Sequence, residues 1–381
     1  MIKRDLGLYV HIPFCLKKCD YCDFLSGPGT NEEQAYYFRT LLKEIRGFES
    51  LSNLYRIKSL FIGGGTPSSV DSSYIKQIVD QLKSQYDFAE DAEMTIECNP
   101  GTLTEEKLKT YRDLGINRLS IGLQSADNDE LALLGRIHTF EEFTNNFALA
   151  RRLGFDNINV DLMSGLPGQK MSSWKNTLEK VVELDPDHIS AYSLIIEEGT
   201  PFYDRYTGAG ARKLPDEREE RNMYHYTGEF LANHGYDRYE ISNYAKPGYE
   251  SRHNILYWTL GEYLGFGIGA SSYLSGKRFS NPKEKEEYWD YSRNAYNEFR
   301  FLPVQEDKAT MEEFMFLGLR MMRGIQKKDF EERFHVPYEQ IYGKVTEELA
   351  NADMLALDEG RVYLTERGID LSNRVLAEFL L

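Results

Sequence analysis

The stretch His11–Phe24 reads HIPFCLKKCDYCDF and holds three of the chain's four cysteines within eight residues. Cys15, Cys19 and Cys22 are separated by three residues and then by two. Thiolates this close together can hold one metal centre, and their number decides which kind. A cubane iron–sulfur cluster is usually held by four cysteines, so three cysteines leave one iron open to a small molecule. The motif therefore indicates a cluster with an exchangeable position.

Other chemistries fit the same spacing. A disulfide is disfavoured, because the chain has few cysteines and its N-terminus does not read as a signal peptide. A structural zinc site needs a fourth ligand, which His11 can supply. A redox pair would use Cys19 and Cys22 and ignore Cys15. The spacing alone leaves the zinc and redox alternatives open.

The composition is that of an acidic globular protein. The chain has 381 residues, a formal net charge of −16 and 41% hydrophobic residues, a length that allows one large domain and a small one. No apolar run reaches the length of a membrane span. The acidic balance argues against nucleic acid as a partner, because phosphate contacts need a basic surface. Of the 26 Tyr and 21 Phe, a few can line a pocket for a flat ligand, while most are expected in the core.

The first half of the chain alternates short apolar runs with amphipathic helical stretches. Candidate strands are Leu8–Ile12, Ser59–Gly63, Met94–Cys98, Arg118–Gly122, Asn157–Met163 and His188–Ile195. Candidate helices between them are Glu32–Phe48, Ser72–Tyr86, Thr104–Leu114, Phe140–Leu153 and Ser172–Leu184. This alternation predicts an α/β fold, with a parallel sheet and helices outside it. Such a sheet presents its chemistry at the carboxyl ends of its strands.

Polar or glycine-rich motifs occur where the predicted strands end. The cysteine loop follows the first strand, and GGGTP (63–67) follows the second. Glu97, Gln124 and Asp161 lie at or near the ends of the next three strands. Because the carboxyl ends of parallel strands meet at one edge, the sequence predicts a pocket ringed by these residues.

The chain divides into three predicted parts. Residues 1–200 form the core, and residues 201–303 are a less regular extension rich in Tyr, Asn and Gly. Residues 304–381 contain a hairpin that turns at 358–360 and a final helix, after helical patterns at Met311–Met322, Lys327–Phe334 and Tyr338–Ala352. This order predicts a small helical, winged-helix-like domain. Its 16 acidic and 10 basic residues do not suit DNA, so we expect a structural or partner-docking unit.

Four stretches carry a resemblance to a known family: YVHIPFC (9–15), FIGGGTPS (61–68), RLSIGLQS (118–125) and VDLMSGLPGQ (160–169). Together with the cysteine spacing, they resemble the radical S-adenosylmethionine (SAM) superfamily. The closer match is to the branch of oxygen-independent coproporphyrinogen III oxidase (HemN) and the haem chaperone HemW, with HemW the closest resemblance. The match covers nearly the whole chain. It implies a partial (β/α)6 radical SAM barrel followed by the winged-helix-like domain.

The resemblance also assigns cofactors and residues. A 4Fe-4S cluster would be held by Cys15, Cys19 and Cys22, and SAM would chelate the open iron. The residues implied around the cluster and SAM are Tyr9, Tyr21, Gly64, Gly65, Thr66, Glu97, Gln124, Arg136 and Asp161. Elementary chemistry agrees, since glycine backbone allows close approach to the methionine amino group and a carboxylate can hold that ammonium. An arginine suits the methionine carboxylate by bidentate geometry, and the Gln–Asp pair resembles a ribose-binding pair.

Three features separate the oxidases from the haem chaperones of this branch. The oxidases carry an extra cysteine where this chain has Phe24, and a longer segment before the cysteine motif. The chaperone relatives carry an HNxxYW motif, which here is His253–Trp258. Histidine is a common axial ligand of haem iron, and neighbouring aromatic rings can cover a porphyrin face. The resemblance therefore implies a haem chaperone that binds haem at His253 and passes it to an acceptor protein.

Two alternatives stay open. The first is radical SAM catalysis of the oxidative decarboxylation of coproporphyrinogen III in porphyrin biosynthesis. The second is a zinc-stabilised interaction protein, an interpretation that does not explain the presence of Glu97 or Arg136. Cys98 is expected to be a buried free thiol close to the SAM pocket. We further expect a cytoplasmic monomer or homodimer whose partners are haem and an acceptor protein, with no nucleic acid and with membrane contact only through that acceptor.

Overall fold

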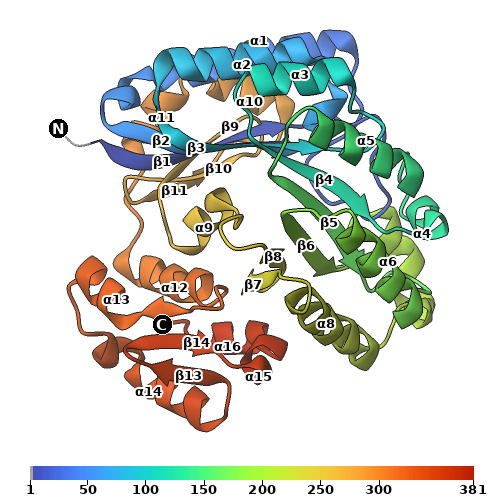
Figure 1. Cartoon of the computed structure of the whole chain (residues 1–381). Coiled ribbons are helices and arrows are strands. Elements are labelled where there is room, and N and C mark those ends of the chain that lie inside the picture. Colours follow the sequence, from blue (N-terminus) through green and yellow to red (C-terminus); the bar gives the residue numbers. More distant parts are fainter. Residues whose placement is uncertain (1–2) are drawn as a thin grey trace.

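The computed structural model describes residues 3–381 and is built on an 11-stranded sheet in the order β11-β10-β9-β1-β2-β3-β4-β5-β6-β8-β7 (Figure 1). Six central strands are parallel and follow sequence order: β1 (Arg4–Ile12), β2 (Tyr55–Gly64), β3 (Asp87–Cys98), β4 (Arg118–Gln124), β5 (Ile158–Ser164) and β6 (His188–Ser193). Their outer face is covered by α1 (Asn31–Gly47), α2 (Ser72–Gln85), α3 (Glu105–Asp113), α4 (Asn128–Leu133), α5 (Phe140–Arg152) and α6 (Met171–Glu183). The predicted α/β fold with a partial (β/α)6 barrel is confirmed.

The differences from the sequence prediction have local causes. β3 begins at Asp87, seven residues before the predicted Met94, because its polar first half still pairs with the start of β2. The pairing is irregular between Ile57 and Ser59, which breaks the alternation that a strand prediction relies on. The short helix α4 was not predicted, since six residues are too few for a helical period. Its only strong signal is the cap at Asp127, whose carboxylate accepts two backbone N–H bonds.

The middle of the chain extends the sheet at both edges. β7 (Asp237–Glu240) and β8 (Asn243–Ala245) lie next to β6, while β9 (Tyr263–Phe266), β10 (Ser271–Leu274) and β11 (Lys277–Ser280) lie next to β1. The helices of this part are α7 (Pro201–Tyr206), α8 (Glu217–Ala232), α9 (Arg252–Trp258), α10 (Lys285–Tyr291) and α11 (Ala295–Phe301). Helix α9 lies on the face of the sheet opposite α1 and α2 (Figure 1). The inner face of the curved sheet is therefore partly covered by the chain itself.

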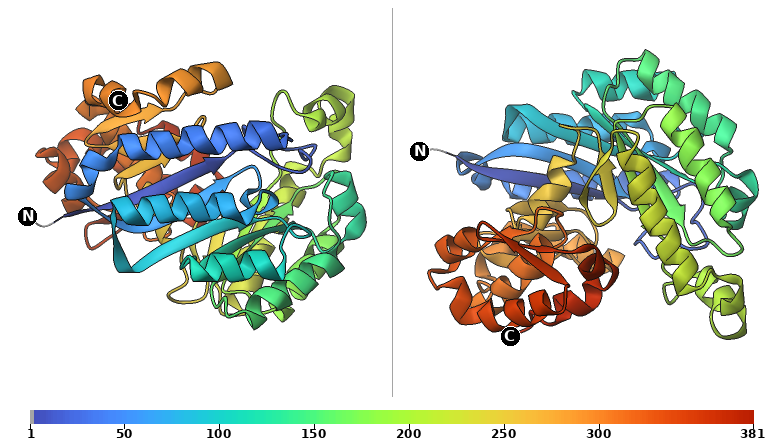
Figure 2. Two further views of the ribbon diagram at one scale, coloured as in Figure 1. Left: turned by 90° about the horizontal axis from the view of Figure 1, so that it is seen from above. Right: turned by 60° about the horizontal axis from the view of Figure 1, so that its bottom comes forward.

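The last elements form a unit with its own core (Figure 2, right). Its three-stranded sheet has the order β12-β14-β13, from β12 (Ile325–Gln326), β13 (Leu355–Asp358) and β14 (Arg361–Leu364). Its helices are α12 (Asp307–Gly318), α13 (Lys327–Phe334), α14 (Tyr338–Asn351), α15 (Glu366–Asp370) and α16 (Ser372–Ala377). Three helices followed by a hairpin match the winged-helix-like arrangement, while the exact limits of the three parts stay predictions. Within residues 3–381, no helix combines the length and the apolar character needed to cross a bilayer.

A buried carboxyl group ties α1 to the middle part of the chain. Glu44 is fully buried. It accepts hydrogen bonds from the Tyr288 hydroxyl and the Asn281 amide, both at 2.7 Å, and from the Gly267 backbone N–H at 3.0 Å. Burial raises the pKa of Glu44 to about 7, although the three donors favour its charged form. One side chain thus joins α1, the turn after β9 and α10.

Glu44 predicts a pH-dependent stability. Its pKa is higher in the folded than in the unfolded protein, so the unfolded state loses this proton first as the pH rises. The free energy of unfolding should fall between pH 4.5 and pH 7, by about 3 kcal/mol from this group. Glu44→Gln removes this titration. The free energy of unfolding of the variant, measured by urea denaturation at a series of pH values, should therefore fall less over this range, by about 3 kcal/mol. Glu32 is exposed on the same helix, so Glu32→Gln serves as the control. A Glu44→Gln protein whose stability changes with pH as much as that of the wild type would contradict the prediction.

Candidate cofactor site inside the barrel

A cavity of about 600 Å³ lies inside the curved sheet. Its lining comes from the loop after β1, from strands β2 to β6 and from the segments after α4 and β6, and also from the β7–β8 turn, β8 and α9. It brings together eleven of the residues singled out from the sequence: Cys15, Cys19, Tyr21, Cys22, Gly64, Gly65, Thr66, Glu97, Gln124, Arg136 and Asp161. These residues converge because the carboxyl ends of the parallel strands share one edge.

The loop after β1 presents the three cysteines as partly exposed free thiols. Backbone hydrogen bonds close the loop, from Cys15 N–H to the Gly27 carbonyl at 3.1 Å and from Gly27 N–H to the Pro13 carbonyl at 3.0 Å. Burial raises the pKa of Cys15 and of Cys22. Cys15 and Cys22 are therefore held as thiols near neutral pH, and metal binding would release their protons.

The donor set distinguishes a cluster from a single metal ion. Across residues 3–381, no three His, Cys, Asp or Glu side chains lie close enough together to hold one ion. His11, the candidate fourth zinc ligand, shares one hydrogen bond with the Tyr9 hydroxyl and another with the Leu25 carbonyl, both at 2.9 Å. In a cubane each thiolate binds a different iron, so the thiols need not converge on one point. Three free cysteines facing one cavity fit a 4Fe-4S cluster with an open iron.

The GGGTP turn lies directly against the cysteine loop. Thr66 N–H donates to the Phe14 carbonyl at 2.7 Å. Gly64 has a φ of 118°, and a Cβ at this position would lie 2.7 Å from the His11 ring. A Cβ at Gly65 would lie 2.7 Å from the Phe14 carbonyl oxygen. Only glycines allow this close approach of the two loops.

Glu97 provides a carboxyl group in the cavity that forms no ion pair with any of residues 3–381. Its Oε2 accepts a hydrogen bond from Gly64 N–H at 2.9 Å. Burial, and to a smaller extent the Asp161 carboxylate, raise the pKa of Glu97 to about 8. A cation bound next to Glu97 would offset both effects. The position therefore suits the amino group of a ligand.

Arg136 provides the complementary group. Its guanidinium donates to Asn99 Oδ1 at 2.8 Å, to the Gly122 carbonyl and to Cys19 Sγ at 3.6 Å. No ion pair within residues 3–381 includes Arg136. A guanidinium held beside the cysteines without a carboxylate partner suits a ligand carboxylate, which it can bind in bidentate geometry.

Gln124 and Asp161 lie on the neighbouring strands β4 and β5. Gln124 has a φ of 76°, and its Oε1 accepts a hydrogen bond from the Tyr192 hydroxyl at 3.1 Å. Asp161 accepts hydrogen bonds from the Asn159 amide at 2.7 Å and the Ser120 hydroxyl at 3.3 Å. These contacts fix both side chains and leave lone pairs free, since a carboxylate offers about four acceptor sites. They are placed to accept hydrogen bonds from ligand hydroxyls.

The other residues singled out from the sequence lie around the cavity. Tyr9 does not line it, and its ring stacks on Phe61 with centroids 6.3 Å apart. Phe24 lines it and is 62% exposed. Cys98 also lines it, and burial raises the pKa of its thiol. Cys98 is thus a largely buried free thiol next to the cofactor cavity.

The structure does not bring His253 into the cavity. His253 lies on α9 and is 1% exposed. Its Nδ1 shares a hydrogen bond with the Ser59 hydroxyl at 2.8 Å, and its Nε2 shares one with the Tyr257 hydroxyl at 2.7 Å. The next residue, Asn254, does line the cavity. The HNxxYW motif therefore forms part of the cavity wall through its second residue.

Polar residues on the inner faces of β4, β5 and β6 were missed from the sequence. The cavity lining includes, from these strands, Arg118, Ser120, Asn159 and Ser190. They occupy alternate positions, so a polar pattern with a period of two inside otherwise apolar strands was the available signal. The interior of this part of the barrel is polar rather than packed with apolar side chains.

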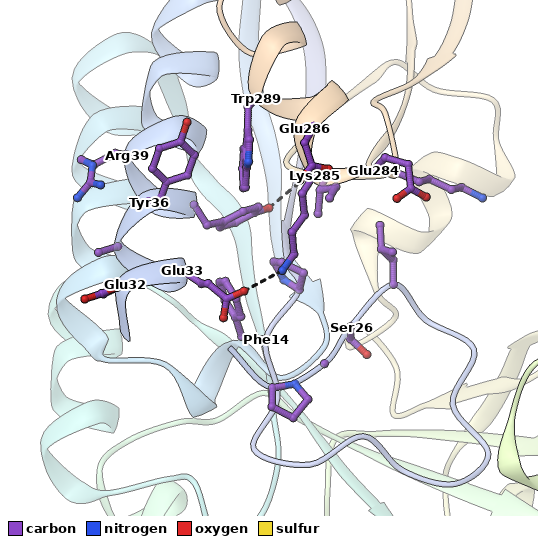
Figure 3. Close-up of a pocket in the computed structure, with 18 residues that line it drawn as sticks. Phe14, Ser26, Glu32, Glu33, Tyr36, Arg39, Glu284, Lys285, Glu286 and Trp289 are labelled. Carbon is purple, nitrogen blue, oxygen red and sulfur yellow. Dashed lines mark hydrogen bonds and ion pairs between the residues drawn. The ribbon is translucent and has the colours of Figure 1, made fainter. Parts of the chain in front are cut away.

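A second cavity, of about 960 Å³, lies between α1, α10 and the outer side of the cysteine loop (Figure 3). Lys285 crosses it to pair with Glu33 at 3.0 Å, and Tyr36 packs edge-on against Trp289 with ring centroids 4.9 Å apart (Figure 3). Ser26 lines both cavities, so the cysteine loop separates them. None of the predicted cofactor residues lines this second cavity.

Comparison with known proteins places these features among relatives. The model of the radical SAM superfamily matches residues 9–181, and that of the HemN C-terminal domain matches residues 306–371. "Heme chaperone HemW" of Lactococcus lactis is 38% identical over 100% of this chain and 99% of its own length. The protein of the same name from Bacillus subtilis is 36% identical over 98% of each chain. The solved structure of Escherichia coli coproporphyrinogen III oxidase (HemN), described as a radical SAM enzyme, matches with a TM-score of 0.86 and 25% identity, over 99% of this chain and 90% of that one.

Gly64→Ala tests the contact between the GGGTP turn and the cysteine loop. The added Cβ would meet His11 at 2.7 Å in a strained backbone conformation, at an expected cost of about 2 kcal/mol in unfolding free energy. Displacement of the loop should also lower the iron and sulfide content after anaerobic reconstitution. Gly47→Ala, where a Cβ meets open space, is the control. A Gly64→Ala protein with normal stability and full iron content would show that the contact is dispensable.

Proposed function

Because this chain belongs to the radical SAM superfamily, within the family of the relatives named heme chaperone HemW, we propose that it binds haem and passes it to an acceptor protein. The observation that carries the proposal is the HNxxYW motif, His253–Trp258, on α9, whose second residue, Asn254, lines the cofactor cavity. We place this activity in the cytoplasm, in a monomer or homodimer. The acceptor is proposed to be a protein, which would also make any membrane contact.

The cavity would hold the cofactors that radical SAM proteins use, a 4Fe-4S cluster and SAM. The three loop cysteines would bind three irons and leave the fourth to SAM. Glu97 would accept hydrogen bonds from the methionine amino group, and Arg136 would bind the methionine carboxylate. Gln124 and Asp161 would hold the ribose hydroxyls. In such proteins a reduced cluster supplies an electron for the cleavage of SAM.

We propose that haem iron binds Nε2 of His253. In the tautomer with the proton on Nδ1, the Nδ1–H group donates a hydrogen bond to the Ser59 hydroxyl. Nε2 then carries a lone pair, which accepts a hydrogen bond from the Tyr257 hydroxyl. Ser59 would then fix the tautomer and the ring orientation, as the hydrogen-bond partners of metal-binding histidines commonly do. Tyr257 lies one helical turn away on α9, and its displacement costs one hydrogen bond, about 1 kcal/mol. Haem binding thus requires a local opening at Tyr257.

His253→Ala should weaken haem binding at least tenfold, because the axial ligand is removed. Titration of the Soret band measures the affinity. Tyr257→Phe removes only the hydroxyl that competes for Nε2 and should bind haem at least as tightly as the wild type. His225→Ala, an exposed histidine on α8, is the control. Wild-type affinity in His253→Ala would reject this ligand.

The second candidate function is the oxidative decarboxylation of coproporphyrinogen III, favoured by the full-length likeness to the HemN structure. Phe24 stands where the oxidases carry a further cysteine, so we expect no turnover. The test is an anaerobic assay of the reconstituted protein with SAM, a reductant and coproporphyrinogen III, with E. coli HemN as positive control. Robust formation of protoporphyrinogen would make this chain an oxidase.

A further inference from the structure

Arg118 is a second arginine of the cofactor cavity. It lines the cavity and is 2% exposed. Its guanidinium makes no ion pair with any of residues 3–381, and its Nε has no hydrogen-bond partner there. Arginine is almost never buried without a counter-charge, because desolvating a cation is costly. Arg118 therefore presents to the cavity a buried guanidinium that forms no direct ion pair with any of the described residues.

Arg118 lies far from the cysteines. Arg118, Ser120, Gly122 and Gln124 line the cavity from alternate positions of β4. Six strand residues span about 20 Å, so the backbone of Arg118 is at the opposite end of the strand from Gln124. Arg136, beside the cysteines, already offers a cation for the SAM carboxylate. The charge of Arg118 is thus available for a different anion.

Six side chains of the cavity lining in this region are neutral hydrogen-bonding groups: Ser120, Asn159, Ser190, Ser242, Asn243 and Asn254. The nearby carboxylates already have partners, since Asp161 accepts from Ser120 and Asn159, Glu240 from Asn243, and Glu93 from the His253 backbone N–H. Burial, and then the Arg118 guanidinium, lower the pKa of His188 and bring that of His253 to about 3, so both rings stay neutral. A single guanidinium without a direct carboxylate partner suits one singly charged carboxylate, which it can bind in bidentate geometry. A phosphate dianion would be disfavoured by the nearby carboxylate of Asp161 and would need more than one cation.

We propose that Arg118 binds a propionate carboxylate of a tetrapyrrole at this end of the cavity. The inference rests on the proposed function, because the tetrapyrrole is what the chain is proposed to carry. Haem and coproporphyrinogen share the propionate group, so the chemistry is the same for both candidate functions. Asn254 lines this end of the cavity next to His253, so a haem bound through His253 has a propionate site within the same wall.

The experiment compares three probes on the wild-type protein and on Arg118→Gln. The probes are haem, coproporphyrin III, which has propionates but no iron, and coproporphyrin III tetramethyl ester, which has neither iron nor free acid. Binding is followed by the Soret band and by porphyrin fluorescence. The control is Arg252→Gln, because Arg252 is exposed on the same helix as His253 and pairs with Asp91 at 3.0 Å.

We expect Arg118→Gln to bind haem and coproporphyrin III at least about tenfold more weakly than the wild type and Arg252→Gln, with no change for the ester. Equal coproporphyrin III affinity in Arg118→Gln and the wild type would overturn the inference. So would a wild-type protein that binds the ester as tightly as the acid. This second comparison needs no variant, so it can overturn the inference even if Arg118→Gln fails to fold.

The two proposals fail in different ways. Haem binding by the wild type that does not depend on Arg118 would leave the haem chaperone standing and overturn the propionate site. Arg118-dependent binding of coproporphyrin III without binding of haem would support the propionate site and reject the chaperone. Failure of the wild type to bind either probe would reject both.

Discussion

The parallel register between β1 and β2 places His11 opposite Gly63 and Ile12 opposite Gly64. The two loops that follow therefore leave the sheet at the same level, and the cysteine loop lies against the GGGTP turn. A shift of one residue would turn every side chain of the strand to the other face and separate the loops. The positions of the cysteines, and of Glu97 through its bond to Gly64, depend on this register.

In strands β4 to β6, the side chains on one face pack in the hydrophobic core, and those on the other face line the cavity. Leu119, Ile121 and Leu123 are fully buried in the main hydrophobic core, while the alternate residues of β4 line the cavity. A barrel interior would be more stable if it were filled with apolar side chains. The polar lining thus lowers stability locally in return for a place to bind a charged ligand, as is common at functional sites.

The order of strands and helices, and the meeting of strand-end motifs in one cavity, were accessible from the sequence because both follow from period and topology. The start of β3 at Asp87 was not, since the polar residues there are held only by pairing with β2. Only part of the surroundings of His253 could be predicted from the sequence. Tyr257 belongs to the same motif, but Ser59 is 194 residues away in the chain. Arg118 belongs to the RLSIGLQS stretch, yet only the fold shows that its side chain lines the cavity and forms no ion pair with any described residue.

Arg118 and Arg136, which form no ion pair within residues 3–381, also bear on the lifetime of the protein. A buried charge without its counter-ion weakens the empty fold, and a ligand that supplies the anion stabilises only the folded state. Ligand binding therefore reduces the fraction of molecules that are unfolded at any moment. In a cell that clears unfolded chains by proteolysis, the abundance of this protein would follow the supply of its ligands.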